Sequence, residues 1–232
     1  MSVVKPVSGS FRLECEMFDP VLAAIPSLFP APSCATRVVR EAAVGNVIPD
    51  LLIGQWCAEA SCSVPSMTNV ARHVVALLQR SSGSAAPAVF IEDELYLSSS
   101  ALTRAVTLLK RIGALSYEAP EGELHLAPEF AKATQVKLIA VEMKMTRWRE
   151  ALNQAIRYLD FADEAYVVLD GNQVTLTDEI IKAFELSAPG LYIQRGAYPE
   201  KVLDACPVPS VPSADRLLAM HKVMHSGPHC FA

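Results

Sequence analysis

The sequence predicts an α/β protein in which a helical module interrupts a series of strands and helices, and three observations support this. Residues 36–44 and 47–54 have the pattern of two strands joined by Gly45-Asn46, a two-residue hairpin signal. Residues 67–130 have a different texture, with apolar residues at helical spacing. From residue 136 onward, strand and helix patterns alternate, as expected for a sheet with helices packed against it.

Composition and charge limit the class of protein. The chain has 232 residues, of which 51% are hydrophobic and 19% charged, which predicts a packed core in one large domain or two small ones. There is no run of roughly 20 apolar residues and no signal-peptide pattern, so we expect a soluble cytoplasmic protein that does not enter a membrane. The net charge of −5 argues against a protein that simply coats nucleic acid. Six cysteines without a CxxC pair predict free, buried thiols.

The central module has the element order of a known DNA-binding unit. Residues 67–81 predict an amphipathic helix, and residues 90–97 are ambiguous, with a short helix as one interpretation. The next helix opens with serine caps at 98 and stops at Gly113. Residues 115–130 predict a hairpin with "PEGE" as its turn. Three helices followed by a two-stranded wing resemble a winged helix-turn-helix module.

The patterns predict further elements on both sides of this module. Residues 14–29 predict a short helix with an acidic start and interrupting prolines, and residues 57–66 are small and polar, as in a linker. The strongest helical pattern covers residues 147–162. The other expected elements are strands at 136–145, 165–170 and 190–195, a helix at 176–190 capped by Thr177 or Asp178, a proline-rich arm at 206–213 and a closing helix at 214–224.

Three residues in these strands have types suited to chemistry on a phosphodiester. Because side chains alternate along a strand, Glu142 and Lys144 lie on the same face, about 7 Å apart along it. Asp50 follows Pro49 inside an apolar run, where an unpaired carboxylate is costly. Two carboxylates from neighbouring strands form a hard oxygen site suited to Mg²⁺, and an adjacent lysine orients water or stabilises developing charge.

Pro49-Asp50 followed by Glu142-Met143-Lys144 resembles the PD-(D/E)XK nuclease superfamily, which has the restriction-endonuclease-like fold. The helix "WREALNQAIRY" strengthens the resemblance, because many such nucleases carry a similar helix with a glutamine near the site, here Gln154. The resemblance implies a mixed central sheet flanked by helices and covers about residues 10–56 and 134–195. It also implies an additional metal-binding glutamate, for which Glu14 and Glu41 are the candidates and Glu16 is a third option.

The spacing of the two motifs departs from the compact pattern of these nucleases. About 90 residues separate Asp50 from Glu142, which predicts an inserted domain. We expect residues 1–63 and 132–232 to form the nuclease-like domain and residues 64–131 the winged-helix insert. The residues expected on a recognition helix are Ser98–Ser100, Thr103, Arg104, Lys110 and Arg111. Residues 64–130 nevertheless hold five basic and seven acidic side chains, a net −2, so contact with DNA and contact with protein both stay open.

These observations predict a nuclease that cleaves DNA with Mg²⁺ or Mn²⁺. Asp50 and Glu142 would hold the metal with Glu41 or Glu14, Lys144 would orient the attacking water, and Gln154 would support the site. Residues 131–158 hold six basic and two acidic side chains, a local +4, and Arg147 and Arg149 are candidates for phosphate contact. The alternatives are a non-cleaving DNA-binding regulator and a protein-interaction scaffold, each using the insert, and a homodimer fits any of them.

Overall fold

The computed structural model describes residues 11–57, 64–116, 122–128, 130, 136–196, 198–208, 211–225 and 230–231. Its strands are β1 (Cys34–Arg40), β2 (Leu51–Cys57), β3 (Ala85–Pro87), β4 (Glu123–His125), β5 (Lys137–Lys144), β6 (Glu164–Asp170), β7 (Gly190–Arg195), β8 (Tyr198–Leu203) and β9 (Cys230–Phe231). Its helices are η1 (Glu14–Met17), α1 (Phe18–Leu28), α2 (Asn69–Arg80), η2 (Ser82–Ser84), α3 (Ala88–Glu94), α4 (Ser99–Arg111), α6 (Trp148–Tyr158), α7 (Asp178–Glu185) and α8 (Ala214–His225).

The larger sheet is mixed, and its strand order is β8-β7-β6-β5-β2-β1-β9. Strands β5, β6 and β7 run parallel, joined by crossovers that contain α6 and α7. Strand β2 pairs antiparallel with both β1 and β5, and β8 pairs antiparallel with β7. The expected α/β class is therefore confirmed. The sequence patterns did not predict β8 or β9, which are the two edge strands of this sheet.

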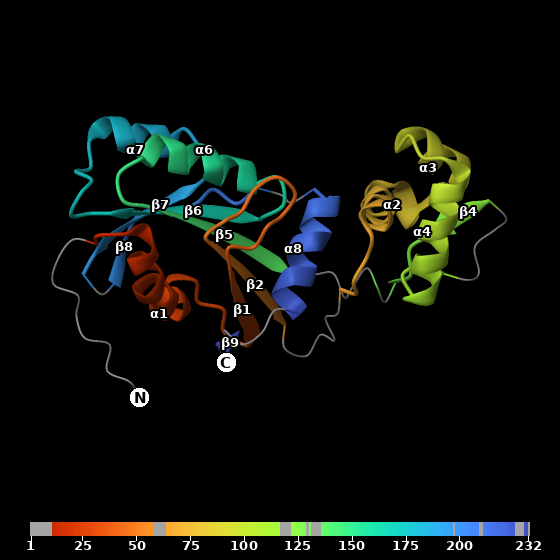
Figure 1. Cartoon of the computed structure of the whole chain (residues 1–232), viewed down its shortest axis with the longest axis horizontal. Helices are drawn as coiled ribbons and strands as arrows, with labels where there is room; N and C mark the ends of the chain where they lie inside the picture. The colour runs from red at the N-terminus through yellow and green to blue at the C-terminus, as the bar shows by residue number, and fades with distance from the viewer. Residues whose placement is uncertain are drawn as a thin grey trace.

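The two faces of this sheet pack against different helices (Figure 1). In β5, Ile139, Val141 and Met143 face the layer that contains η1 and α1. Leu138 and Ala140 face the opposite layer, which contains α6, α7 and α8. All five side chains are buried, because a strand in the middle of a sheet is covered on both faces. The alternation expected for this strand is therefore present.

The first hairpin places Asp50 just before a strand rather than within one. The ladder between β1 and β2 runs from Cys34 opposite Cys57 to Arg40 opposite Leu51. The predicted turn at Gly45-Asn46 is present as a small excursion beyond that ladder, where Val44 bridges Val47 and Gly45 has a φ of +56°. The second strand thus begins at Leu51, later than the sequence pattern predicts.

The helical module contains the expected helices and two short strands. Strand β3 pairs antiparallel with β4, and Leu115 bridges Leu126 beside them. Residues 82–87 form η2 and β3, and the ambiguous "FIEDELYL" stretch contains most of α3. The predicted turn, "PEGE", falls partly outside the described residues. Ser98 caps the start of α4, because its hydroxyl accepts a hydrogen bond from Ala101 N, as the capping pattern predicts.

The module joins the rest of the molecule through α2 and α8, which pack together (Figure 1). Buried residues of the module and of the α8 layer belong to one continuous apolar cluster. At this junction the imidazoles of His221 and His225 both lie 2.9 Å from the carbonyl oxygen of Val64. The module is therefore attached by a packed core as well as by its two chain connections.

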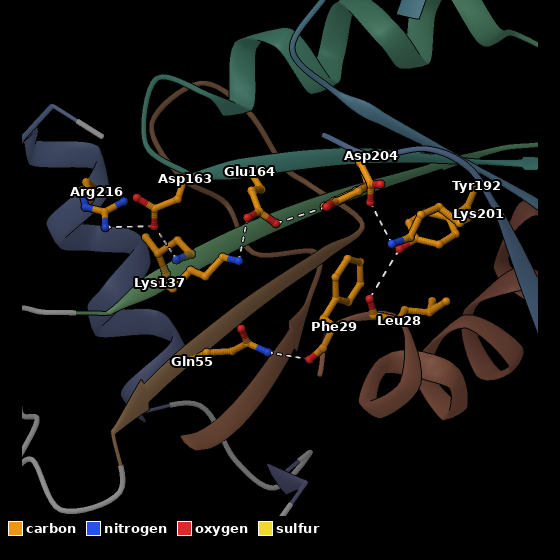
Figure 2. A network of polar contacts seen from close by, with 12 residues as sticks. Leu28, Phe29, Gln55, Lys137, Asp163, Glu164, Tyr192, Lys201, Asp204 and Arg216 are labelled. Atoms are coloured by element: carbon orange, nitrogen blue, oxygen red, sulfur yellow. Dashed lines mark hydrogen bonds and ion pairs between the residues drawn. The ribbon is translucent and has the colours of Figure 1, made fainter. Parts of the chain in front are cut away.

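Polar contacts at the amino ends of β5 and β6 hold α8 and the parallel strands together (Figure 2). The guanidinium of Arg216 on α8 donates to Asp163 Oδ2 at 3.0 Å and to the carbonyls of Phe161 and Val136. Lys137 Nζ lies 2.6 Å from Glu164 Oε1. These partners are already mutually satisfied, so we assign this cluster a structural role.

Two further expectations can be compared with the structure. Cys15, Cys34, Cys57 and Cys206 are free, as expected, but they are exposed, so the prediction of buried thiols is wrong for these four. They lie near the ends of elements, where the core does not cover them. No helix among the described residues is long and apolar enough to cross a membrane.

Candidate active site

Asp50, directly before β2, lies next to Glu142 of the neighbouring strand β5. Leu51 of β2 pairs with Val141 of β5, so one step further along this antiparallel ladder Asp50 stands opposite Glu142. Asp50 Oδ2 accepts a hydrogen bond from Met143 N at 2.6 Å, which fixes this carboxylate to the backbone of β5. The structure therefore brings together two carboxylates that are 92 positions apart in the sequence.

Lys144 and Glu142 form a buried ion pair on the face of β5 that α6 covers. Lys144 Nζ lies 2.8 Å from Glu142 Oε1, and the two side chains are 10% and 2% exposed. The hydroxyl of Tyr158, on α6, donates to the other oxygen, Glu142 Oε2, at 2.5 Å. Both oxygens of Glu142 are thus held by donors, which removes much of the penalty for burying its charge.

Glu14 is the glutamate that the structure brings to this pair. It belongs to η1, and its Oε2 lies 3.4 Å from Lys144 Nζ while its Oε1 accepts from Met145 N at 3.4 Å. Glu16 instead accepts from Arg12 N at 2.7 Å within its own turn. Glu41 donates its backbone N–H to the Asp50 carbonyl at 3.0 Å, but its side chain is exposed and makes no contact with the described site residues.

Burial and neighbouring charges change the pKa values of Asp50 and Lys144. Burial, and then the charge of Glu142, raise the pKa of Asp50 to about 7 from an ordinary value of 3.8. Burial acts to lower the pKa of Lys144, but its hydrogen bond to Glu142 and the surrounding carboxylates outweigh that effect and raise it. The lysine is therefore a stable cation at neutral pH, whereas Asp50 changes its charge there.

Tyr158 is the residue of this site whose role the sequence did not reveal. Its apolar surroundings on the helix pattern indicate a packing residue, yet it is 1% exposed and its hydroxyl contacts Glu142. Burial, followed by the hydrogen bond to Glu142, raises the pKa of Tyr158, so this hydroxyl stays protonated as a donor. The available signal was its spacing from Gln154, because residues four apart lie on the same side of a helix. Gln154 Oε1 is buried without a hydrogen-bond partner among the described residues.

The donor chemistry of the site suits a hard divalent cation. Asp50, Glu142 and Glu14 offer carboxylate oxygens, the ligand type that Mg²⁺ prefers. Within the described part of the chain, however, no three His, Cys, Asp or Glu side chains lie close enough together to hold a metal ion. Glu14 and Glu142 are both drawn toward Lys144 instead, so metal binding requires these side chains to shift. Burial, and after it the negative charge of Glu142, raise the pKa of Asp50, and a bound cation would offset the charge part of this effect.

The basic residues expected to contact phosphate lie outside this buried cluster. Arg147 forms an ion pair with Glu150 at 2.8 Å, and Arg149 pairs with Glu179. Both guanidiniums are exposed, so these pairs are weak and can exchange for another anion. The basic residues of α4, which are Arg104, Lys110 and Arg111, are exposed on the helical module.

Comparison with protein-family models, curated proteins and solved structures finds no match. The functional argument for this chain therefore rests on the geometry of its candidate site.

Proposed function

We propose that this protein is a metal-dependent nuclease of the PD-(D/E)XK kind that hydrolyses phosphodiester bonds in DNA. The observation that supports it best is the convergence of Asp50, Glu142, Lys144 and Glu14 from three distant segments. Glu142 and Lys144 are 2% and 10% exposed, and burying an ion pair carries a desolvation penalty that the attraction between the charges does not always offset, so this pair favours a functional role. Burial and perturbed proton affinity are typical of functional sites.

Each residue has a distinct role in this proposal. Asp50, Glu142 and Glu14 would hold Mg²⁺ or Mn²⁺, and the ion, when bound, would polarise the phosphodiester and acidify water. Lys144 orients the attacking water and stabilises the charge that develops on the phosphate. Tyr158 keeps the carboxylate of Glu142 oriented by donating to one of its oxygens.

Gln154 and the exposed arginines extend this proposal toward the substrate. Gln154 lies one turn before Tyr158 on α6, with its amide oxygen unpaired in the described structure, so its amide is available to a group bound at the site. Arg147 and Arg149, at the start of the same helix, would exchange their carboxylate partners for DNA phosphates. Such contacts position the backbone without reading its sequence.

The helical module would grip DNA in this proposal. Helices α2, α3 and α4 and the paired strands β3 and β4 support this reading, with β3 between α2 and α3 rather than after the three helices as expected, and α4 presents Arg104, Lys110 and Arg111 to solvent. Charge-reversal of Arg104 and Arg111 should weaken binding to short duplex DNA and reduce its salt dependence by about one phosphate contact per residue. If fluorescence anisotropy shows the same dependence of DNA affinity on salt concentration for the native and the charge-reversed protein, these arginines of α4 do not contact DNA.

The direct test is cleavage of supercoiled plasmid and of single-stranded DNA with Mg²⁺ or Mn²⁺. The native protein should cut, chelator should stop it, and Lys144→Ala should abolish it. Lys137→Ala is the matched control, because Lys137 lies in the same strand and also forms an ion pair, but at the other end of β5. If the native protein cuts neither DNA form with either metal, the nuclease proposal is wrong.

A second candidate function is a protein-interaction scaffold without cleavage, and the surface of α3 supports it. Val89, Phe90 and Tyr96 are 68%, 46% and 95% exposed, next to the exposed acids Asp93 and Glu94. Apolar and acidic groups of this kind favour a protein partner with basic and apolar side chains over DNA. In this case Lys144→Ala would leave function unchanged, while Phe90→Asp would disrupt it in a pull-down with the native partner.

A further inference from the structure

The ammonium of Lys144 already occupies the position between two of the acidic groups of the site. Its Nζ lies 2.8 Å from Glu142 Oε1 and 3.4 Å from Glu14 Oε2, so one cation bridges carboxylates from β5 and from η1. The lysine side chain is only 10% exposed. Water therefore screens the contact with Glu142, which is 2% exposed, more weakly than the contact with Glu14, which is 39% exposed.

We propose that Lys144 is a built-in competitor of the metal. Its ammonium neutralises Glu14 and Glu142 in the metal-free protein and must yield both carboxylates, in part or fully, before a divalent cation binds. The lysine released in this way is then placed to contact water and phosphate. This inference rests on the proposed metal site, and it makes the lysine responsible for weak metal affinity as well as for chemistry.

Three contacts indicate that the acids stay tied to the site without the lysine. Glu142 Oε2 remains bound by the Tyr158 hydroxyl at 2.5 Å, and Glu14 Oε1 by Met145 N at 3.4 Å. Asp50 is held independently by Met143 N at 2.6 Å. A substitution that removes only the ammonium thus leaves three carboxylates tied to the site with no neutralising cation, and Glu14 and Glu142 are then no longer drawn away from a metal ion by the lysine. Such a group binds a divalent ion more tightly, because the repulsion and the competition from Lys144 are both gone.

The competing view is that Lys144 organises the site, so that losing it disorders the acids and weakens metal binding. The two views predict opposite signs. Lys144→Met keeps a side chain of similar length without charge, and we expect Mn²⁺ to bind this variant at least ~10-fold more tightly than the native protein. Lys144→Arg keeps the charge, so it should bind Mn²⁺ no more tightly than the native chain.

The test is isothermal titration calorimetry of Mn²⁺ into the full chain after chelator treatment, for the native protein, Lys144→Met, Lys144→Arg and Lys137→Met. Lys137→Met is the matched control, because it removes the ion pair with Glu164 at 2.6 Å from the far end of the same strand. It should bind Mn²⁺ like the native protein. Lys144→Gln, a second uncharged variant, replaces Lys144→Met if circular dichroism shows that the latter is unfolded.

The outcomes separate this inference from the proposed function. Tighter Mn²⁺ binding by Lys144→Met, combined with loss of DNA cleavage, supports both. Equal or weaker binding by a folded Lys144→Met overturns the competition while leaving the metal site intact. If the native protein binds Mn²⁺ but cuts no DNA, the nuclease proposal fails and the affinity comparison still decides the competition. If neither the native protein nor Lys144→Met binds Mn²⁺, the metal site and the competition are both wrong.

Discussion

Asp50→Asn should stabilise the metal-free protein at alkaline pH. Asparagine keeps the acceptor for Met143 N and removes the charge that faces Glu142. The pKa of Asp50 is about 7 in the folded chain against 3.8 for the ordinary group, so the native protein loses stability as the pH rises through this window. At 1.36 kcal/mol per pKa unit, the full shift corresponds to at most about 4 kcal/mol, or roughly 10 °C in Tm for a chain of this size.

The assay is thermal unfolding in chelator at pH 8 and at pH 5, followed by circular dichroism. The gain should be largest at pH 8 and shrink toward pH 5, because the native carboxyl is protonated in the folded state there. Asp163→Asn is the control: that carboxylate accepts from Arg216 at 3.0 Å, so its loss should lower the Tm. An equal rise in Tm for Asp50→Asn at both pH values would refute the ionisation argument. A lower Tm than the native protein at pH 8 would show that the ionised Asp50 stabilises the fold.

Three further substitutions test the packing and the polar contacts around the site. Tyr158→Phe removes the hydrogen bond to Glu142, so it should lower stability by about 2 kcal/mol and weaken Mn²⁺ affinity, measured by melting and calorimetry. Gly54→Ala would bring a methyl group within 2.3 Å of Val223 on α8, costing about 1–3 kcal/mol, and Val223→Ala in the same chain should recover part of this in a double-mutant cycle. Arg216→Met should cost about 3 kcal/mol in urea unfolding, because the carbonyls of Phe161 and Val136 lose a donor and Asp163 loses its ion-pair partner. Unchanged stability would show that Arg216 has no structural role.

Local patterns in the sequence were sufficient for most of the elements near the site. The nearly continuous apolar run of β5 follows from burial on both faces of the sheet. The helical spacing of apolar residues in α6 follows from its single buried stripe. Capping patterns also predicted a serine cap for α4 and either Thr177 or Asp178 for α7, and the caps are Ser98 and Thr177. The sequence patterns did not predict the strands β3, β8 and β9. These strands are short or lie at sheet edges, where pairing with a neighbouring strand matters more than their own composition.

The insertion of the helical module could be anticipated from spacing, but its attachment could not. A gap of about 90 residues between Asp50 and Glu142 exceeds any hairpin, so the chain had to leave the sheet and return. The sequence contains no local sign that α2 packs against α8, which lies more than a hundred residues later. That contact depends on two apolar stripes that meet only after the chain has folded.

The sequence by itself determined which residue types were available and on which face of each strand they lie. It placed Glu142 beside Lys144, because the pleat of a strand fixes this for residues two apart. Only the tertiary structure decided which glutamate joins them and which hydroxyl holds Glu142. Glu14 and Tyr158 reach the ion pair from η1 and α6, and the distances of 3.4 Å and 2.5 Å are set by long-range packing. The pKa of Asp50 likewise depends on burial and on neighbours distant in sequence, so no local pattern contains it.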